Sequence, residues 1–370
     1  MTASSQRDRA ARVAIARLDE PGDKTLAALV RDQGHERVLA ELRSGRPHQL
    51  AIRLRPRLDR TANIDDDAIA RALHATILTP ADPQWPHRLG DLEWPPHCLW
   101  VRGERDLNEL CVRSVALVGA RAATPYGLDQ AATLAMGLVS RGFTILSGAA
   151  FGIDGAAHRG ALAAAGRTVA VLACGIDRAY PLAHADLLGA ILDQDGAVVT
   201  ELPPGAAPYR RRFLERNRLI AALTAGTVVV EAALRSGSLS TAGEALTLSR
   251  PVGAVPGPVT SMSSAGCHRW IRDQMATLVT DAAEVADLVG AYGDDAASPS
   301  RGVTQPPDDL PPLQRQVWEV LPVRVFAALE SLADRAALGE LEVASGLGQL
   351  EARGMAQRDG DRWRRSRVAT

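Results

Sequence analysis

Between residues 79 and 288, short apolar runs alternate with longer stretches rich in alanine and leucine. Parallel strands that are buried on both faces read as continuous apolar runs, and helices connect such strands. The pattern therefore predicts an α/β fold with a Rossmann-like, doubly wound parallel sheet. We expect its strands at residues 115–118, 143–146, 168–172, 197–200, 227–230 and 252–255.

The segments on either side of this core have different patterns. Residues 1–75 predict a small helical domain of the helix-hairpin-helix or SAM-like kind, because Pro21 and Gly22 form a turn between two helical stretches. The core then occupies residues 76–289, and residues 290–312 are a flexible linker rich in Gly, Ser, Pro and Asp. Residues 313–370 predict a winged-helix-like domain, with three helices and then a hairpin around Gly360.

Lysine-dependent chemistry is nearly excluded, because Lys24 is the only lysine in the chain. A P-loop needs a lysine on its phosphates, and a pyridoxal phosphate enzyme needs one for its Schiff base. We expect no cofactor, no metal and no catalytic residues. The formal net charge is −1, so a nucleic-acid site must be local rather than spread over the surface.

Several features are typical of a cytoplasmic protein without membrane association. The four cysteines lie far apart and form no CxxC pair, which suits reduced thiols. No apolar run approaches the roughly 18 residues of a membrane span. Residues 1–10 also lack the apolar core of a signal peptide.

The first two predicted strands end in loops with anion-binding features. The first strand runs into Gly119, Ala120 and Arg121, just before a helix. Free backbone N–H groups and the helix dipole favour an anion there, and the arginine is placed to clamp a phosphate. The alternative is a packing glycine and a solvated arginine. The second strand ends in Ser147 and Gly148, whose small size lets a backbone approach closely.

The loop after the second strand does not predict dinucleotide binding or catalysis. Its glycine spacing is not GxGxxG, and no acid follows about 20 residues on to hold a ribose. Asp154 and His158 share a helix face at i,i+4 and could form an acid–base pair. Without a third group, we favour a local hydrogen bond that fixes the loop.

Residues 208–218 hold five arginines and two aromatic residues against one glutamate. Arginines neutralise phosphates, and an aromatic ring stacks on an unpaired base at roughly 1–3 kcal/mol. The segment therefore favours single-stranded over duplex DNA. A structural alternative buries the aromatic ring and pairs two arginines with acids such as Glu201 or Glu231. The residues expected to contact DNA here are Arg210, Phe213, Arg216, Asn217 and Arg218.

A further loop, residues 231–242, follows a predicted strand and opens another helix. Its Ser236, Gly237 and Ser238 again suit an anion. Three such strand ends, together with the arginine-aromatic segment, predict a track for a phosphate backbone. Their expected contributions to it are Gly119, Arg121, Ser147, Gly148, Ser236, Gly237 and Ser238.

Six motifs appear in order, at residues 115–121, 147–158, 175–181, 213–218, 236–242 and 254–257. Together they resemble the DNA-processing protein A family (DprA, also called Smf), over roughly 200 residues, about the size of one domain. The resemblance implies a non-enzymatic mediator that binds and protects incoming single-stranded DNA during natural transformation or related recombination. It also implies a homodimer that loads the recombinase RecA. By position, Arg121 would hold a backbone phosphate, Arg210 would be a basic DNA contact, and Phe213 would stack on a base. Asn217 and the loop of Ser236–Ser238 would line the pocket.

Three features depart from the pattern of this family. Ala120 replaces a usual Ser or Thr, and His268 replaces a usual Asn, which changes the hydrogen bonding of those loops. The expected recognition helix, residues 338–352, carries three glutamates and no basic residue, although a helix in the major groove should be basic. We predict that this module binds protein, or binds DNA only through its hairpin arginines, Arg358, Arg362, Arg364, Arg365 and Arg367.

Two alternatives remain open. One is a nucleotide-binding or nucleotide phosphoribohydrolase-type Rossmann enzyme, since residues 237–244 faintly resemble the loop of that group, although the PGGxGT signature is absent. The other is a nucleotide-sensing or interaction module that acts through its terminal domains. Release of a free base from a nucleotide would favour the enzyme, and tight binding of a mononucleotide without preference for longer strands would favour the sensor.

Overall fold

The computed structural model describes residues 3–44, 49–61, 63–103, 105–291, 295–297 and 309–366. The chain divides into two units, Met1–Ala297 and Ser298–Thr370, and each is described by itself. Much of the predicted linker at 290–312 lies outside the described residues, as does Arg367 of the predicted hairpin.

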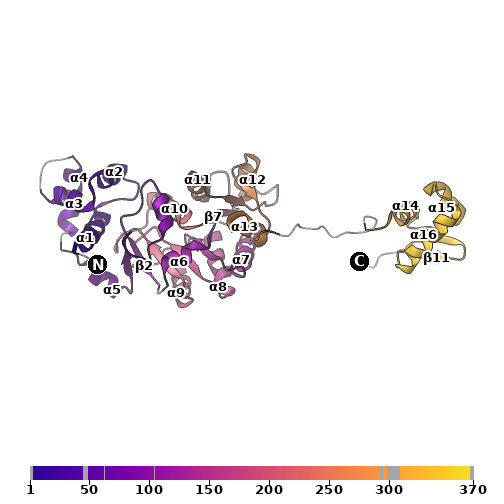
Figure 1. Ribbon diagram of the computed structural model, residues 1–370, viewed down its shortest axis with the longest axis horizontal. Coiled ribbons are helices and arrows are strands. Elements are labelled where there is room, and N and C mark those ends of the chain that lie inside the picture. Colours follow the sequence, from indigo (N-terminus) through magenta and orange to yellow (C-terminus); the bar gives the residue numbers. More distant parts are fainter. Residues whose placement is uncertain are drawn as a thin grey trace. The chain divides into compact units, whose positions relative to one another are not determined.

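A nine-stranded sheet forms the centre of the first unit, in the order β1-β2-β6-β5-β4-β3-β7-β8-β9 (Figure 1). The strands from β6 to β9 in this order are parallel, which confirms the predicted, mostly parallel α/β sheet. At one edge of the sheet the pairing is antiparallel, because β1 pairs with β2 and β2 with β6 in this way. The bounds are β1 Thr76–Leu78, β2 Leu99–Arg102, β3 Ser114–Gly119, β4 Thr144–Ser147, β5 Thr168–Val171, β6 Ala197–Thr200, β7 Gly226–Glu231, β8 Val252–Ala254 and β9 Thr277–Leu278.

Helices cover both faces of this sheet because side chains alternate along each strand. In β3, Val115 and Leu117 join one apolar cluster, whereas Ala116 and Val118 join the cluster on the opposite face. The first cluster includes α7 (Pro125–Val139), α8 (Ile153–Ala163) and α13 (Ala282–Val289). The second includes α6 (Leu107–Val112), α10 (Arg210–Leu223), α11 (Ser238–Thr247) and α12 (Ala265–Arg272). Figure 1 shows α11 and α12 across the sheet from α7 and α8.

The strand order reverses between β3 and β7. From β3 the chain winds outward through β4 and β5 to β6, and then returns through α10 to place β7 on the other side of β3. In open α/β sheets, the crevice outside the carboxyl ends of the strands at such a reversal is where ligands bind. The loops after β3 and β7, and the first turn of α10, meet at this point.

Five helices precede the sheet, within the same unit. They are α1 (Ala3–Leu18), α2 (Lys24–Gln33), α3 (His35–Arg43), α4 (Gln49–Thr61) and α5 (Asp66–Ala72). The first four share a core that includes Ile15, Leu26 and Leu54. One side of α1 instead packs with the sheet, because Val13 and Ala16 belong to the cluster that contains Trp100. On that face lies α9 (Ala185–Asp193).

The second unit has three helices and a three-stranded antiparallel sheet, in the order β10-β12-β11. Its core includes Val317, Leu332, Leu347 and Trp363. The elements are α14 (Pro312–Val320), β10 (Ala327–Ala328), α15 (Leu329–Ala336), α16 (Glu340–Ala352), β11 (Ala356–Asp359) and β12 (Arg362–Arg365). In the part of the chain that the structure describes, no helix is long and apolar enough to cross a membrane.

Candidate functional site

An open groove of about 920 Å³ lies at the strand reversal. Its walls come from the loop after β3, the first turns of α10 and the loop between β7 and α11. We call it the switch-point groove. Among the residues predicted to contact DNA, it brings together Gly119, Arg121, Arg210, Phe213, Arg216, Asn217, Ser236, Gly237 and Ser238.

A stack of side chains stands in this groove. The guanidinium carbon of Arg121 lies 4.6 Å from the centroid of the Phe213 ring. On the same ring, Tyr180 makes a tilted contact with 5.5 Å between centroids. Phe213 is half-buried, so the alternative in which it belongs to the core is wrong. The arrangement offers an aromatic surface next to a fixed positive charge.

The arginines of α10 divide between the groove and internal contacts. Arg210 is exposed and lines the groove, and so does Arg235 from the loop after β7; neither has an acidic partner among the described residues. Arg212 instead binds the Glu20 carboxylate with its Nη2 at 2.8 Å. Arg218 pairs with Glu201, as the structural alternative predicted. Three guanidinium groups therefore face the groove without an acid, those of Arg121, Arg210 and Arg235.

Arg216 is a buried support beneath the groove. Only 5% of the residue is exposed, and its Nη1 donates to the carbonyl of Val171. It packs against Gly148, where any Cβ atom would overlap its guanidinium. Burial lowers the pKa of Arg216 to about 10, although nearby Asp154 favours the charged form. The arginine therefore fixes the floor, and Gly148 is required for its close approach.

The loop after β3 does not offer the open helix N-terminus that the sequence predicted. The Glu231 carboxylate, at the end of β7, accepts hydrogen bonds from the Thr124 backbone N–H at 2.8 Å and from its hydroxyl at 2.7 Å. Glu231 is 1% exposed, and a Cβ atom on Gly127 would meet it at contact distance or closer. The prediction of free N–H groups at this helix was wrong, because an internal carboxylate occupies the position. Arg121 is what this loop presents to the groove.

The loop after β7 is held by its own hydroxyls and by α10. Ser236 Oγ and Ser238 Oγ are 2.7 Å apart, and Asn217 Nδ2 donates to the carbonyl of Gly237 at 3.3 Å. Gly237 is exposed at the start of α11, which has no side-chain cap. Asn217 thus ties the arginine-bearing helix to this loop.

Three predicted contact residues do not line the groove. Ser147 is buried and donates from Oγ to the Leu117 carbonyl at 2.7 Å. Gly148 lies under Arg216, and Arg218 points to Glu201 instead of the groove. These residues hold the loops, and a role in contacting a ligand stays a prediction for them.

Asp154 and His158 are not an acid–base pair. Asp154 accepts from the Gly148 N–H at 3.1 Å, and burial raises the pKa of this carboxyl. His158 lies one turn after Asp154 on α8, and its Nδ1 is 2.7 Å from Thr168 Oγ1. Each side chain fixes a strand end, which agrees with the local hydrogen bond that we favoured over catalysis.

The comparisons with known proteins point to one family. The family model of DNA recombination-mediator protein A matches residues 76–290. A putative DNA processing protein DprA of Mycobacterium tuberculosis is 43% identical over 95% of this chain and 92% of its own. This chain belongs to the DNA recombination-mediator protein A family.

Other members of the recombination-mediator protein A family match as well. Protein Smf of Escherichia coli is 43% identical over 57% of this chain and 56% of its own. The crystal structure of DNA processing protein A (DprA) from Streptococcus pneumoniae has a TM-score of 0.62 and 31% identity, over 75% of this chain and 98% of that one. DNA processing protein A from Helicobacter pylori, whose structure concerns its single-stranded DNA binding mode, has a TM-score of 0.52 and 29% identity, over 58% of this chain and 96% of that one. These matches support a DNA-processing, recombination-mediator role.

Two of the departures from the family pattern, at Ala120 and His268, have different structural outcomes. Ala120 lines the groove, and its backbone N–H donates to the Glu231 carbonyl at 2.7 Å. His268 Nε2 lies 3.0 Å from the Gly257 carbonyl, so a hydrogen-bonding side chain still reaches the loop after β8. Sequence reasoning missed Tyr180 and Arg235 as groove residues. Tyr180 could have been found as an aromatic residue in a loop, and Arg235 as an arginine directly before Ser236.

Proposed function

We propose that the switch-point groove binds single-stranded DNA and that the protein acts there as a recombination mediator without catalysis. The observation that carries this proposal is the contact between Arg121 and Phe213, 4.6 Å from guanidinium carbon to ring centroid. A base can stack on the ring only when it is unpaired, while the cation binds a neighbouring phosphate. Gly119, Asn217 and the loop of Ser236, Gly237 and Ser238 would line the path.

The charge of the groove supports a phosphate backbone as its ligand. Arg121, Arg210 and Arg235 have no acidic partner among the described residues, so a strand would neutralise about three arginines. Neutralising each phosphate of a single strand contributes about −0.7 to the log–log salt slope. Three contacts therefore give roughly −2, and neighbouring contacts bring the expected range to roughly −2 to −4.

The chemistry of the groove favours binding over catalysis. Asp154 is the one carboxylate among the described residues that line it, and it is 7% exposed and engaged by the Gly148 N–H. A general base must reach the proton that it removes. A buried carboxylate that braces its own loop is badly placed for that role, and the nucleotide phosphoribohydrolase alternative loses support.

The test is binding of a fluorescent oligo-dT strand and of the matching duplex across a salt series. We expect the wild type to prefer the single strand, and Arg121→Ala/Arg210→Ala to lose both affinity and salt slope. Arg37→Ala/Arg55→Ala, which removes two exposed arginines from the N-terminal helices, is the matched control. Equal binding of both forms, or release of a free base from a nucleotide, would overturn the proposal.

We further propose that this protein protects the strand, forms a homodimer and loads RecA, as the family resemblance implies. The support is the family membership together with the groove described above. RecA assembly on the bound strand, with and without the protein, tests the loading step. Sedimentation of the free protein tests the dimer.

For the second unit, we propose a winged-helix-like module that binds protein, or binds DNA through its hairpin. Glu340 and Glu342 lie in the first turn of α16, which has no basic residue in its last turn. The hairpin arginines rest on aromatic rings, with the Arg364 guanidinium carbon 4.5 Å from Phe326 and that of Arg365 3.6 Å from Trp318. Arg358 and Arg362 belong to the same hairpin.

A further inference from the structure

A second hollow lies between the N-terminal helices and the core, next to the switch-point groove. Its volume is about 250 Å³, and residues 202–206 form its wall on the core side. Four arginines line it, against two acids, Asp19 and Glu20. We call it the side pocket. Its arginines are Arg17, Arg57, Arg60 and Arg212.

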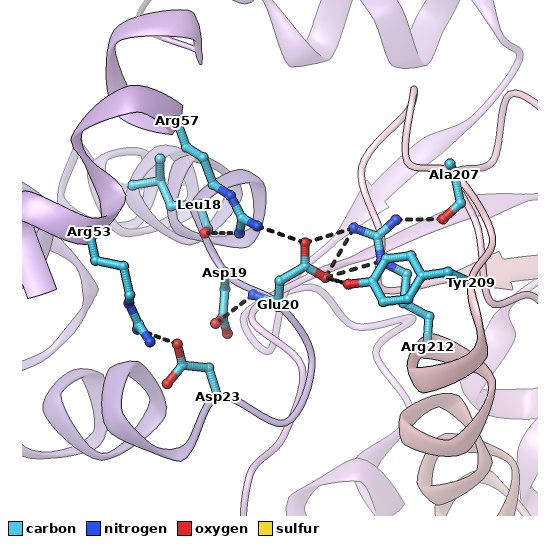
Figure 2. Close-up of polar contacts among 9 residues, drawn as sticks. All are labelled: Leu18, Asp19, Glu20, Asp23, Arg53, Arg57, Ala207, Tyr209 and Arg212. Atoms are coloured by element: carbon cyan, nitrogen blue, oxygen red, sulfur yellow. Dashed lines mark hydrogen bonds and ion pairs between the residues drawn. The ribbon is translucent and has the colours of Figure 1, made fainter.

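The groove and the side pocket share a boundary at the start of α10. Tyr209 lines the groove, and the Arg212 guanidinium carbon lies 4.4 Å from the centroid of its ring. The Tyr209 hydroxyl donates to Glu20 at 2.5 Å, and Glu20 in turn binds Arg57 at 3.1 Å (Figure 2). A chain of direct contacts therefore joins the aromatic rim of the groove to α4.

The charges of the side pocket remain positive after internal pairing. Arg17 is paired with Asp66 at 2.6 Å. Glu20 is neutralised by Arg212 and Arg57; burial alone would raise its pKa, but the hydrogen bonds from Arg212 and Tyr209 hold the pKa below its usual range. One carboxylate shared by two guanidinium groups leaves an excess cation, and Asp19, the other acid of the pocket, contacts His97 Nε2 at 2.9 Å instead of an arginine.

Arg60 adds a second available charge. It is exposed, and its Nε donates to the Pro56 carbonyl of its own helix at 3.0 Å. It has no acidic partner among the described residues of the side pocket. Arg57, with 38% of its side chain exposed, lies one turn before it on the same helix. The two guanidinium groups thus face the same hollow from α4.

We propose that the side pocket is a second phosphate-binding site, where a single strand that fills the groove continues past Tyr209 onto Arg57 and Arg60. The proposal rests on the proposed function of the groove and extends it onto the N-terminal helices. It assigns those helices a direct share in holding the strand. A strand long enough to reach them gains contacts that a short strand cannot make.

The experiment compares oligo-dT strands of about 4 and about 16 nucleotides, the range of site sizes of single-strand-binding folds. The variants are Arg60→Gln and Arg57→Gln/Arg60→Gln. Arg55→Gln is the matched control, because Arg55 lies on the same helix, pairs with Asp59 and does not line the side pocket. Melting temperatures establish that each variant is folded.

We expect Arg60→Gln to weaken binding of the long strand roughly three- to tenfold at low salt and to reduce the salt slope by about 0.7. Binding of the short strand and the behaviour of Arg55→Gln should match the wild type. Arg60→Lys keeps the charge and should retain the slope for the long strand. This rescue separates a phosphate contact from a structural role.

Two outcomes would overturn the proposal that the side pocket binds the strand, without affecting the proposed function of the groove. In the first, Arg60→Gln and Arg55→Gln bind the long strand equally well. In the second, Arg60→Gln weakens both strand lengths by the same factor. Failure of the wild type to bind either strand would instead overturn the proposed function of the groove. Binding of inorganic phosphate that is lost in Arg57→Gln/Arg60→Gln, while that variant binds the long strand as well as the wild type does, would assign the side pocket to the free anion and would also overturn the proposed path of the strand.

Discussion

Arg121 and Phe213 come from opposite halves of the sheet, yet the arginine lies over the ring with its guanidinium carbon 4.6 Å from the centroid. The first follows β3 and the second lies on α10, which leads into β7. The reversal of strand order brings the two elements together. A cation over an aromatic face contributes roughly 0.5–1 kcal/mol when exposed, so each side chain restrains the other before any ligand arrives.

Removing the ring should weaken binding without changing its salt dependence. Phe213→Leu is expected to cost roughly 1–3 kcal/mol, about five- to 150-fold in affinity for oligo-dT, because stacking on a base is lost. Arg121→Gln should instead lower the salt slope by about 0.7, since one phosphate contact disappears. Fluorescence titrations over a salt series distinguish the two. A changed slope in Phe213→Leu would contradict the assigned division of roles.

Replacing the shared carboxylate should loosen the N-terminal helices from α10. Glu20→Gln is expected to lower the free energy of unfolding by about 1–2 kcal/mol at neutral pH, because charge-assisted bonds from Arg212 and Arg57 are lost. Glu41→Gln, at an exposed i,i+4 pair with Arg37, should change it by less than about 0.5 kcal/mol. Urea unfolding measures both.

The contribution of Glu20 to the free energy of unfolding should also be lost at acid pH. Its folded pKa lies below the ordinary 4.5, so its stabilisation is present above that value and is lost as the pH falls through the folded pKa. Wild type and Glu20→Gln should therefore converge in stability as the pH falls through the folded pKa of Glu20. A difference that stays constant down to acid pH would show that the effect is not electrostatic.

Buried His158 should make the fold sensitive to mild acid. Burial lowers its pKa from 6.5 to about 3, with His184 and Arg159 acting in the same direction. Below pH 6.5 the histidine of the unfolded chain is therefore protonated, whereas His158 of the folded chain stays neutral until the pH approaches about 3. The free energy of unfolding therefore has its full value above pH 6.5 and falls as the pH drops from 6.5 toward 3.

The corresponding experiment compares urea unfolding of wild type and His158→Leu at neutral pH and near pH 5. The histidine alone accounts for a fall of about 2 kcal/mol between the two conditions. The leucine variant loses the contact with Thr168 at both pH values. The difference in free energy of unfolding between the two pH values should therefore be smaller for this variant than for the wild type. An unchanged pH dependence would contradict the prediction.

The loop that presents Arg121 needs glycine at position 152. Gly152 has φ of +76°, and a Cβ atom there would overlap the carbonyl oxygen of Ala120. Gly152→Ala should cost more than about 2 kcal/mol of stability and weaken binding of oligo-dT. In Gly243→Ala, inside α11, nothing lies within 4 Å of the added atom, and a gain of roughly 0.5–1 kcal/mol is expected. Thermal unfolding of both variants tests this contrast.

The acidic helix of the second unit should be dispensable for DNA binding. Glu340→Gln/Glu342→Gln removes two negative charges from α16 and should leave affinity for single-stranded and duplex DNA intact or slightly raised. Arg362→Gln/Arg364→Gln is the comparison that tests the hairpin. Loss of DNA binding in the glutamate variant would contradict the proposal that α16 does not contact DNA, because it would identify α16 as a DNA-recognition helix.

The parallel strands from β3 to β8 could be predicted because each is a buried, largely apolar run. The strands that were missed are short or exposed: β1 has three residues, and both residues of β9 are exposed. The stretch Leu99–Arg102 was also missed, because it holds one β-branched residue, whereas β6, of the same length, holds three. These strands exist because a neighbouring strand supplies their hydrogen bonds, which no local pattern contains.

The residues that line the groove were predictable where one short segment held the basic and aromatic side chains. Arg121, Arg210 and Phe213 were identified from local composition, and the groove brings all three together. The pairing of Arg218 with Glu201, and the occupation of the α7 N-terminus by Glu231, depend on contacts between distant segments. The side pocket was hidden for the same reason, since its arginines come from α1, α4 and α10.

Glu231 has a further consequence for the proposed binding of a strand at the groove. The chain fills the N-terminus of α7 with its own carboxylate, through Thr124. The backbone of this loop is therefore ordered during folding, and an arriving molecule does not have to immobilise it. Recognition at this end of the sheet then begins from a rigid surface, so the loop itself contributes little to the entropy change of association.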